Sequence, residues 1–174
     1  MKKIQKIKLS IAQKNLSKKI VDALASYVRT QLLLTVLIAI ISWVLLSLFN
    51  VRYALLLSIF TGALSAAPIF GMLISSVIVA LVAIFDSTRF LPNLPKVVEG
   101  LAILCMFGLF NFLIDYFVSP YLIGKSTNIN PFLLLIVVIV GTAAFGIIGA
   151  LLAVPVMVVI KTVIDHYNHV HYER

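Results

Sequence analysis

The chain has 174 residues, a formal net charge of +8, 62% hydrophobic and only 11% charged residues, and a mean hydropathy of +1.14. Soluble domains are about 45–50% apolar and about 25% charged, so this composition excludes an ordinary soluble domain and predicts an all-α, polytopic membrane protein. A single cysteine, Cys105, excludes a disulfide framework and a cysteine-rich metal site. No P-loop, zinc-protease or serine-hydrolase motif occurs, so we expect no enzyme, no cofactor and no metal.

The first 31 residues form a basic arm that holds eight of the fourteen Lys and Arg residues. Ile4, Ile7 and Ile11 recur at three- and four-residue spacing, which predicts an amphipathic helix on the inner leaflet. Lys and Arg are retained on the cytoplasmic side of membranes, so we expect the arm to be cytoplasmic and do not expect a nucleic-acid partner. Arg29 and Gln31, where the arm enters the first span, are candidates for a cytoplasmic vestibule; the alternative is snorkelling to lipid headgroups.

The first two apolar blocks differ in length. Leu32–Phe49 is uncharged over 18 residues and is long enough for one span. Tyr53–Phe85 is uncharged over 33 residues, about 50 Å as one helix, whereas the hydrocarbon core is about 30 Å thick. Pro68 interrupts helical hydrogen bonding in its centre, with Gly71 close by. We therefore predict two shorter helices joined near Pro68, either a re-entrant hairpin or two thin spans.

The third block, Val97–Val118, is a predicted span that carries three polar residues. Glu99 begins the block and is expected at the membrane interface. Asp115 is the main candidate for chemistry, because an ionisable group inside a span usually faces a cavity or a partner. Asn111 lies four residues earlier on the same helical face, so the two could bind a cation or relay a proton. The alternative is that Asp115 lies at the cytoplasmic interface.

The fourth block, Pro131–Ile160, is uncharged over 30 residues and would be about 45 Å long as a straight helix. It is interrupted by glycine in its middle and by proline near its end: Gly141, Gly146, Gly149 and Pro155. Together with Pro68 and Gly71, these residues are candidates for a transport path, because unwound backbone at membrane depth can contact a solute or ion. The alternative is close helix packing through small residues.

Charge placement predicts a topology with both termini cytoplasmic. If the second and fourth blocks each dip in and return, eleven of the fourteen basic residues lie inside, while Arg52, Arg89 and Lys96 lie outside. Two units, each a span followed by a hairpin and of opposite orientation, are typical of secondary transporters. Gly62–Pro68 and Gly149–Pro155 share Gly-Ala-Leu-x-Ala-x-Pro, which is weak support for a repeat. The predicted parts are the arm (1–31), a membrane domain (32–163) and a polar tail (164–174).

The tail contains His166, His169 and His171. Their spacing matches neither one helical face nor a known metal site, so no metal is predicted there.

An ordered series of segments resembles the autoinducer-2 exporter-like permeases, the AI-2E family: Ser26–Gln31, Ala67–Gly71, Ser119–Gly124, Asn130–Pro131, Phe145–Gly149 and Ala153–Pro155. The second segment is similar to the family's Ile-Pro-Tyr-Ile-Gly break. The resemblance implies an oligomeric, multi-pass permease of the cell inner membrane that moves signals or other small solutes, with cation exchange in some members. Family members are commonly longer, so the chain looks like a C-terminal half. The histidine that often precedes the family's loop proline is Asn130 here, which removes any titrating role at that position.

The functional expectation is therefore a permease for a small solute or signal molecule, with coupling to H⁺ or Na⁺ as an option. Its expected surroundings are the lipid bilayer and either further copies of itself or a partner half-transporter. The alternative from a different class is a truncated scaffold that transports nothing, or half of a split transporter.

Overall fold

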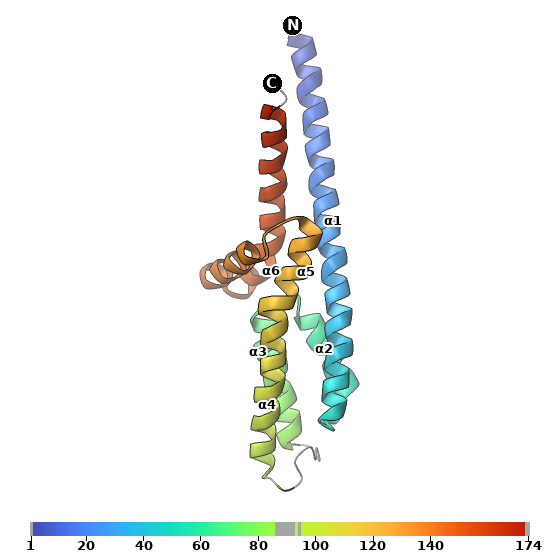
Figure 1. The fold of residues 1–174 in the computed structure, drawn as a ribbon, viewed down its shortest axis with the longest axis vertical. Helices are drawn as coiled ribbons and strands as arrows, with labels where there is room; N and C mark the ends of the chain where they lie inside the picture. The colour runs from blue at the N-terminus through green and yellow to red at the C-terminus, as the bar shows by residue number, and fades with distance from the viewer. Residues whose placement is uncertain (1, 86–92, 94, 173–174) are drawn as a thin grey trace.

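The structure is a computed structural model that describes residues 2–85, 93 and 95–172, with side chains described from residue 15 to residue 168 within those ranges. The described residues form helices and contain no strand, which confirms the all-α prediction (Figure 1). The elements in chain order are α1 (Lys2–Leu48), α2 (Ala54–Leu64), α3 (Phe70–Phe85), α4 (Lys96–Leu113), the π-helical turn η1 (Ile114–Val118), α5 (Ser119–Thr127) and α6 (Pro131–Tyr172). The predicted outer loop with Arg89 lies mostly outside the described residues.

Helix α1 joins the basic arm and the first span in one helix of 47 residues, about 70 Å long at 1.5 Å per residue. No break occurs at residue 31, so the arm continues the axis of the span (Figure 1). By length and composition, the apolar part of α1 is one of three helical segments within the described residues that could cross a bilayer; the others are Lys96–Thr127 and Pro131–Asn168, of which the last is bent at Gly146.

Helices α2 and α3 form the predicted hairpin, and the break is at Pro68 as expected. The chain turns over residues 65–69. The two helices have 11 and 16 residues, or about 16 and 24 Å, both less than the roughly 30 Å of a bilayer core. These lengths favour a re-entrant hairpin over two full spans. In Figure 1 the hairpin starts at the end of the molecule opposite the two termini and turns back partway along it.

Helix α6 folds back on itself at Gly146, whose φ of 59° and ψ of −136° are not helical. Glycine has no Cβ and reaches this region readily, whereas other residues do not. The prediction of a broken fourth block is confirmed, and the break is at the central glycine. Pro155 lies inside the returning helix and is not the turning point. The shared Gly-to-Pro motif therefore occupies different structural positions in the two hairpins, because Pro68 lies in a turn.

Two apolar clusters hold the helices together. The first joins α1, η1, α5 and α6 through buried side chains such as Ile38, Ile123 and Val154. The second joins all four helices α1, α2, α3 and α4 through side chains such as Leu46 and Phe107. Both termini lie at the end of the first cluster, and the α2–α3 hairpin belongs to the second (Figure 1). The two clusters meet near the tip of that hairpin, where Phe110 packs against both.

Candidate transport site

A small cavity lies where the two broken hairpins approach each other. Its wall includes Pro68 and Ile69 from the tip of the α2–α3 hairpin, and Asp115 from η1. Apolar side chains from both arms of α6 complete it, among them Leu134 and Val154. Two of the predicted path residues, Pro68 and Asp115, are therefore brought together from different blocks of the sequence.

Asp115 binds the backbone at the tip of the α2–α3 hairpin. Its Oδ2 accepts a hydrogen bond from the Ile69 N–H at 3.1 Å. Ile69 has a φ of 70°, a genuine outlier for a β-branched residue. This conformation costs about 1–3 kcal/mol and persists because the surroundings hold it. The carboxylate thus anchors a strained turn, and strained backbone of this kind is concentrated at functional sites.

Asp115 lies on the only π-helical turn in the described residues, Ile114–Val118. Pro120 lies two residues after the end of this turn; it has no N–H for the carbonyl of Tyr116, and its ring crowds the preceding turn. A local widening of the helix relieves this conflict, and such π-turns occur frequently at functional sites. Because of the wider turn, the four-residue spacing to Asn111 no longer places both side chains on one ideal helical face.

Asn111 contacts α3 and does not line the cavity. Its Nδ2 lies 3.2 Å from Ser76 Oγ and 3.5 Å from Ser75 Oγ, and all three residues are buried. Interhelical polar contacts of this kind contribute about 0.6 kcal/mol on average in membrane proteins. Asn111 thus links α4 to helix α3 of the α2–α3 hairpin. Asp115 contacts the tip of the same hairpin. The structure does not bring Asn111 into the cavity wall.

The glycines of the fourth block pack the arms of the α6 hairpin together. A Cβ added at Gly149 would overlap the carbonyl oxygen of Gly141, and one added at Gly141 would lie 2.9 Å from the carbonyl oxygen of Gly149. The arms therefore touch backbone to backbone, as small residues allow in membrane helices. At Gly146 nothing lies within 4 Å of an added Cβ, so that glycine serves the turn and not the packing.

Glycines in the first hairpin act in a similar way. A Cβ added at Gly62 would lie 2.6 Å from the carbonyl oxygen of Thr35 and 2.9 Å from the Cβ of Ala39, both on α1. Gly71 lies against the carbonyl of Leu64 across the turn. The packing interpretation of the glycines is thus supported for both hairpins, and it is compatible with a transport role.

The start of α6 shows why Asn130 and Pro131 occur together. Asn130 Oδ1 accepts a hydrogen bond from the Phe132 N–H at 2.9 Å, which is the usual contact of an N-cap residue. Pro131 occupies the first helical position, where its missing N–H costs nothing. Asn128 just before them has a φ of 54° and ends α5. Asn130 therefore caps the first turn of α6.

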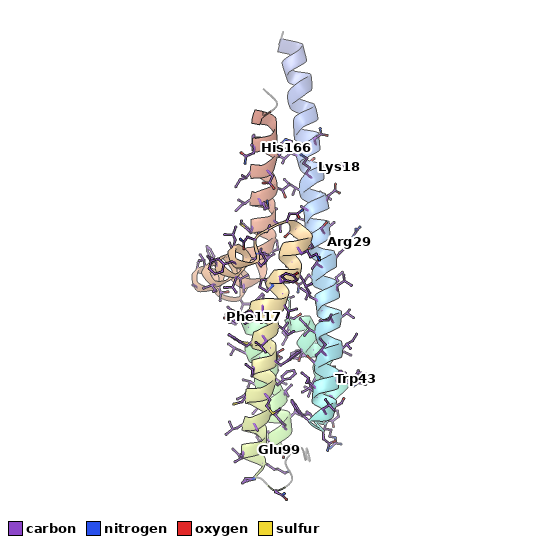
Figure 2. All side chains as sticks on the ribbon, in the orientation of Figure 1. Lys18, Arg29, Trp43, Glu99, Phe117 and His166 are labelled. Atoms are coloured by element: carbon purple, nitrogen blue, oxygen red, sulfur yellow. The ribbon has the colours of Figure 1, made fainter. Side chains whose placement is uncertain are left out.

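The remaining polar candidates lie away from the cavity. Arg29 is exposed on α1, and Gln31 is half-buried. Glu99, expected at an interface, is 0% exposed at the start of α4, far from the termini (Figure 2). Its place in the first turn suits a carboxylate, because the helix dipole is positive there.

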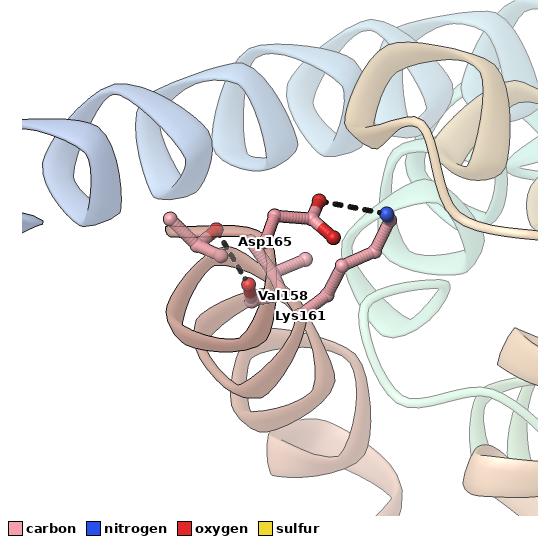
Figure 3. A network of polar contacts seen from close by, with 4 residues as sticks. Val158, Lys161 and Asp165 are labelled. Carbon is pink, nitrogen blue, oxygen red and sulfur yellow. Dashed lines mark hydrogen bonds and ion pairs between the residues drawn. The ribbon is translucent and has the colours of Figure 1, made fainter. Parts of the chain in front are cut away.

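The last turns of α6 carry a surface ion pair. Lys161 Nζ lies 2.9 Å from Asp165 Oδ2, one turn later (Figure 3). The part of the chain that the structure describes has no group of three His, Cys, Asp or Glu residues placed to hold a metal ion. His166 lies in this part, whereas the side chains of His169 and His171 fall outside it.

A second, larger hollow of about 500 Å³ lies along the α6 hairpin. It is lined by apolar residues and by Gly141 and Gly149, without a charged or hydroxyl side chain. Binding sites usually combine an apolar wall with a few convergent polar groups. The cavity at Asp115 has these groups, in Asp115, Tyr116 and Ser119, so we take it as the candidate site.

Sequence reasoning missed several residues of this site. Ile69 and Ser119 line the cavity but have no distinctive pattern of their own. The one available signal was Pro120 five residues after Asp115, since proline in a span implies a local distortion of the helix before it. The apolar residues of α6 that close the cavity could not be distinguished from those that face lipid.

These features define a class of protein: a multi-pass helical membrane protein in which two broken hairpins meet beside a polar group on a distorted span. Comparison with known families gives the more specific result. The family model described as AI-2E family transporter matches residues 1–169, so the chain belongs to the AI-2E transporter family, as its motifs suggested.

Curated relatives agree with this assignment. "Putative transport protein YrrI" of Bacillus subtilis is 26% identical over 88% of this chain and 41% of its own length. "Putative transport protein YueF" of the same organism is 28% identical over 80% of the chain and 36% of its own length. "AI-2 transport protein TqsA" of Escherichia coli is 20% identical over 83% and 40%. The chain thus spans about two fifths of the length of these relatives, and no solved structure matches it.

Proposed function

We propose that the protein is a permease that moves a small solute across the inner membrane, with the cavity at Asp115 on its path. The observation that carries the proposal is the meeting of the Pro68–Ile69 turn, Asp115 and both α6 arms at one cavity. Broken helices that meet at such a site are the usual binding arrangement of secondary transporters. The name of TqsA mentions AI-2, which makes AI-2 the first solute to test.

The size of the cavity limits what this conformation admits. Its volume is about 30 Å³, and one water needs roughly 10–15 Å³. An ion or two waters fit, and an organic solute does not. Passage of a solute therefore requires the hairpins to move apart, and the Asp115–Ile69 hydrogen bond is the polar contact that holds one of them. A carboxylate that releases this N–H to bind H⁺ or Na⁺ would couple the ion to the movement.

Reconstitution into liposomes tests the proposal. We expect flux of AI-2 or of Na⁺/H⁺ that depends on the protein, measured for the chain alone and together with a separately expressed segment that supplies the remaining length of the longer relatives. No flux in either preparation would favour the alternative function, a membrane scaffold without transport. Flux only with the added segment would identify the chain as half of a split transporter.

We further propose that both termini face the cytoplasm. The two termini lie at the same end of the molecule (Figure 1), and the basic arm is part of that end. In a Cys105→Ala background, single cysteines at Asn50 and Ser87 should react with an impermeant thiol reagent added from outside. A cysteine at Asn128 should react only after the membrane is opened. The reverse pattern would overturn this orientation.

A further inference from the structure

A groove of about 260 Å³ between α1 and α5 lies apart from the cavity at Asp115. Its floor is apolar and consists of Leu33, Leu34 and Leu37 from α1 with Leu122 from α5. Its other lining residues are polar: Thr30, Lys125 and Ser126. The groove thus has an apolar part lined by leucines and a polar end that contains Thr30, Lys125 and Ser126.

The polar end coincides with the level at which α1 changes from charged to apolar sequence. Arg29 is the last basic residue before the uncharged stretch that begins at Leu32, and it lies one helical turn before Leu33 on the same face. In Figure 2 Arg29 lies on α1 at the level where α5 ends. Lys125 belongs to the last turn of α5. Lys125 therefore lines the polar end of the groove, and Arg29 lies beside that end, one helical turn before Leu33 on α1.

Both cations are available to a ligand. Arg29 and Lys125 are exposed, and neither forms an ion pair with another described residue. An anionic headgroup would complement their charge, and its acyl chain would follow the leucines towards the membrane centre. Basic pockets between helices on the cytoplasmic side bind lipid headgroups in this way.

We propose that the groove between α1 and α5 is a binding site for one anionic phospholipid, with its phosphate at Arg29 and Lys125. Helix α5 contributes Ser119, Pro120 and Ile123 to the cavity at Asp115 and Leu122, Lys125 and Ser126 to the groove. A lipid in the groove would brace the helix that forms part of the wall of the cavity. The proposal concerns binding and does not depend on the transported solute.

The test is titration of the detergent-purified chain with phosphatidylglycerol or phosphatidylcholine, followed by thermal stability and by native mass spectrometry of retained lipid. We expect phosphatidylglycerol alone to raise the melting temperature and one molecule to be retained. Lys125→Gln should weaken its apparent affinity about fivefold, and Arg29→Gln with Lys125→Gln about twenty-five-fold. Lys18→Gln is the matched control, since it removes the same charge from an exposed position on α1 outside the groove (Figure 2). The affinity of this variant for phosphatidylglycerol should be unchanged.

Three results would overturn the proposal. The first is equal stabilisation by both lipids, and the second is the same loss of affinity in the Lys18 and Lys125 variants, which would indicate diffuse electrostatic attraction. The third is stabilisation by glycerol 3-phosphate as strong as that by phosphatidylglycerol, because a phosphate site alone would then explain the binding.

Discussion

Replacing Gly149 with alanine is expected to abolish most transport while much of the protein still inserts into the membrane. The added Cβ would overlap the carbonyl oxygen of Gly141, and backbone atoms cannot move aside as a flexible side chain can. Overpacking of this kind costs about 1–3 kcal/mol, and here the direct relief is separation of the two α6 arms. Because Leu134 and Val154 lie on different arms and both line the cavity, separation changes the site. Flux per reconstituted molecule measures the effect, with membrane abundance as the reference.

Two further alanine variants separate packing from backbone conformation. Gly108→Ala is the control, because the nearest atom to its added Cβ is Ser76 Oγ at 3.8 Å, so flux should be unchanged. Gly146→Ala meets no atom within 4 Å but has a φ of 59°, and should cost about 1–3 kcal/mol through the backbone alone. If flux and abundance fall in parallel for Gly149→Ala, the glycine contact serves folding only.

Asp115→Asn is expected to lower ion-driven flux by up to about tenfold without disturbing the fold. The amide oxygen of asparagine can still accept the hydrogen bond from the Ile69 N–H that Asp115 Oδ2 accepts now, so the strained turn keeps its anchor. The negative charge is lost, however, and a cation would exchange a charged ligand for a neutral one. Contacts to a charged group are stronger than contacts to a neutral one by about 1.4 kcal/mol. Loss of the charge in Asp115→Asn should therefore weaken cation binding roughly tenfold. Counterflow of Na⁺ or H⁺ in liposomes measures this change.

A pair of companion variants completes the test. Asp165→Asn makes the same change at an exposed residue paired with Lys161, and flux should stay normal. Asp115→Leu removes the acceptor and leaves the Ile69 N–H unpaired, at a cost of about 1–3 kcal/mol, so it should also lower thermal stability. Unchanged flux in Asp115→Asn would refute a coupling role and leave Asp115 as a structural anchor.

Much of the fold follows from local features of the sequence. Uncharged blocks of 33 and 30 residues exceed what one straight span needs, and Pro68 and Gly146 are residues that interrupt helices for reasons of their own backbone chemistry. The hairpins were therefore predictable, whereas the place of the second break was not resolved among three glycines and a proline. Only the backbone angles of Gly146 distinguish a turn from a packing contact.

The site itself depended on tertiary structure. Asp115 could be selected from the sequence because a carboxylate in a span is costly and needs a reason. Its partner could not, since the Ile69 N–H is a backbone group 46 residues away without any side-chain signal. Asn111 was assigned to the same face by helical spacing, but Asp115 lies on the π-turn that follows α4, and Asn111 contacts Ser76 on α3.

The sequence alone thus determined that the chain is a helical membrane protein of the AI-2E type. It also determined that two long apolar blocks break into hairpins, because hydropathy, charge and helix-breaking residues act over short distances. Only the tertiary structure decided which polar groups meet. Contacts between distant segments depend on where each hairpin turns and how closely its helices pack. Pro68 and Gly146 place the two turns, and glycines without a Cβ allow the close packing. The cavity at Asp115 and the groove between α1 and α5 are results of that packing.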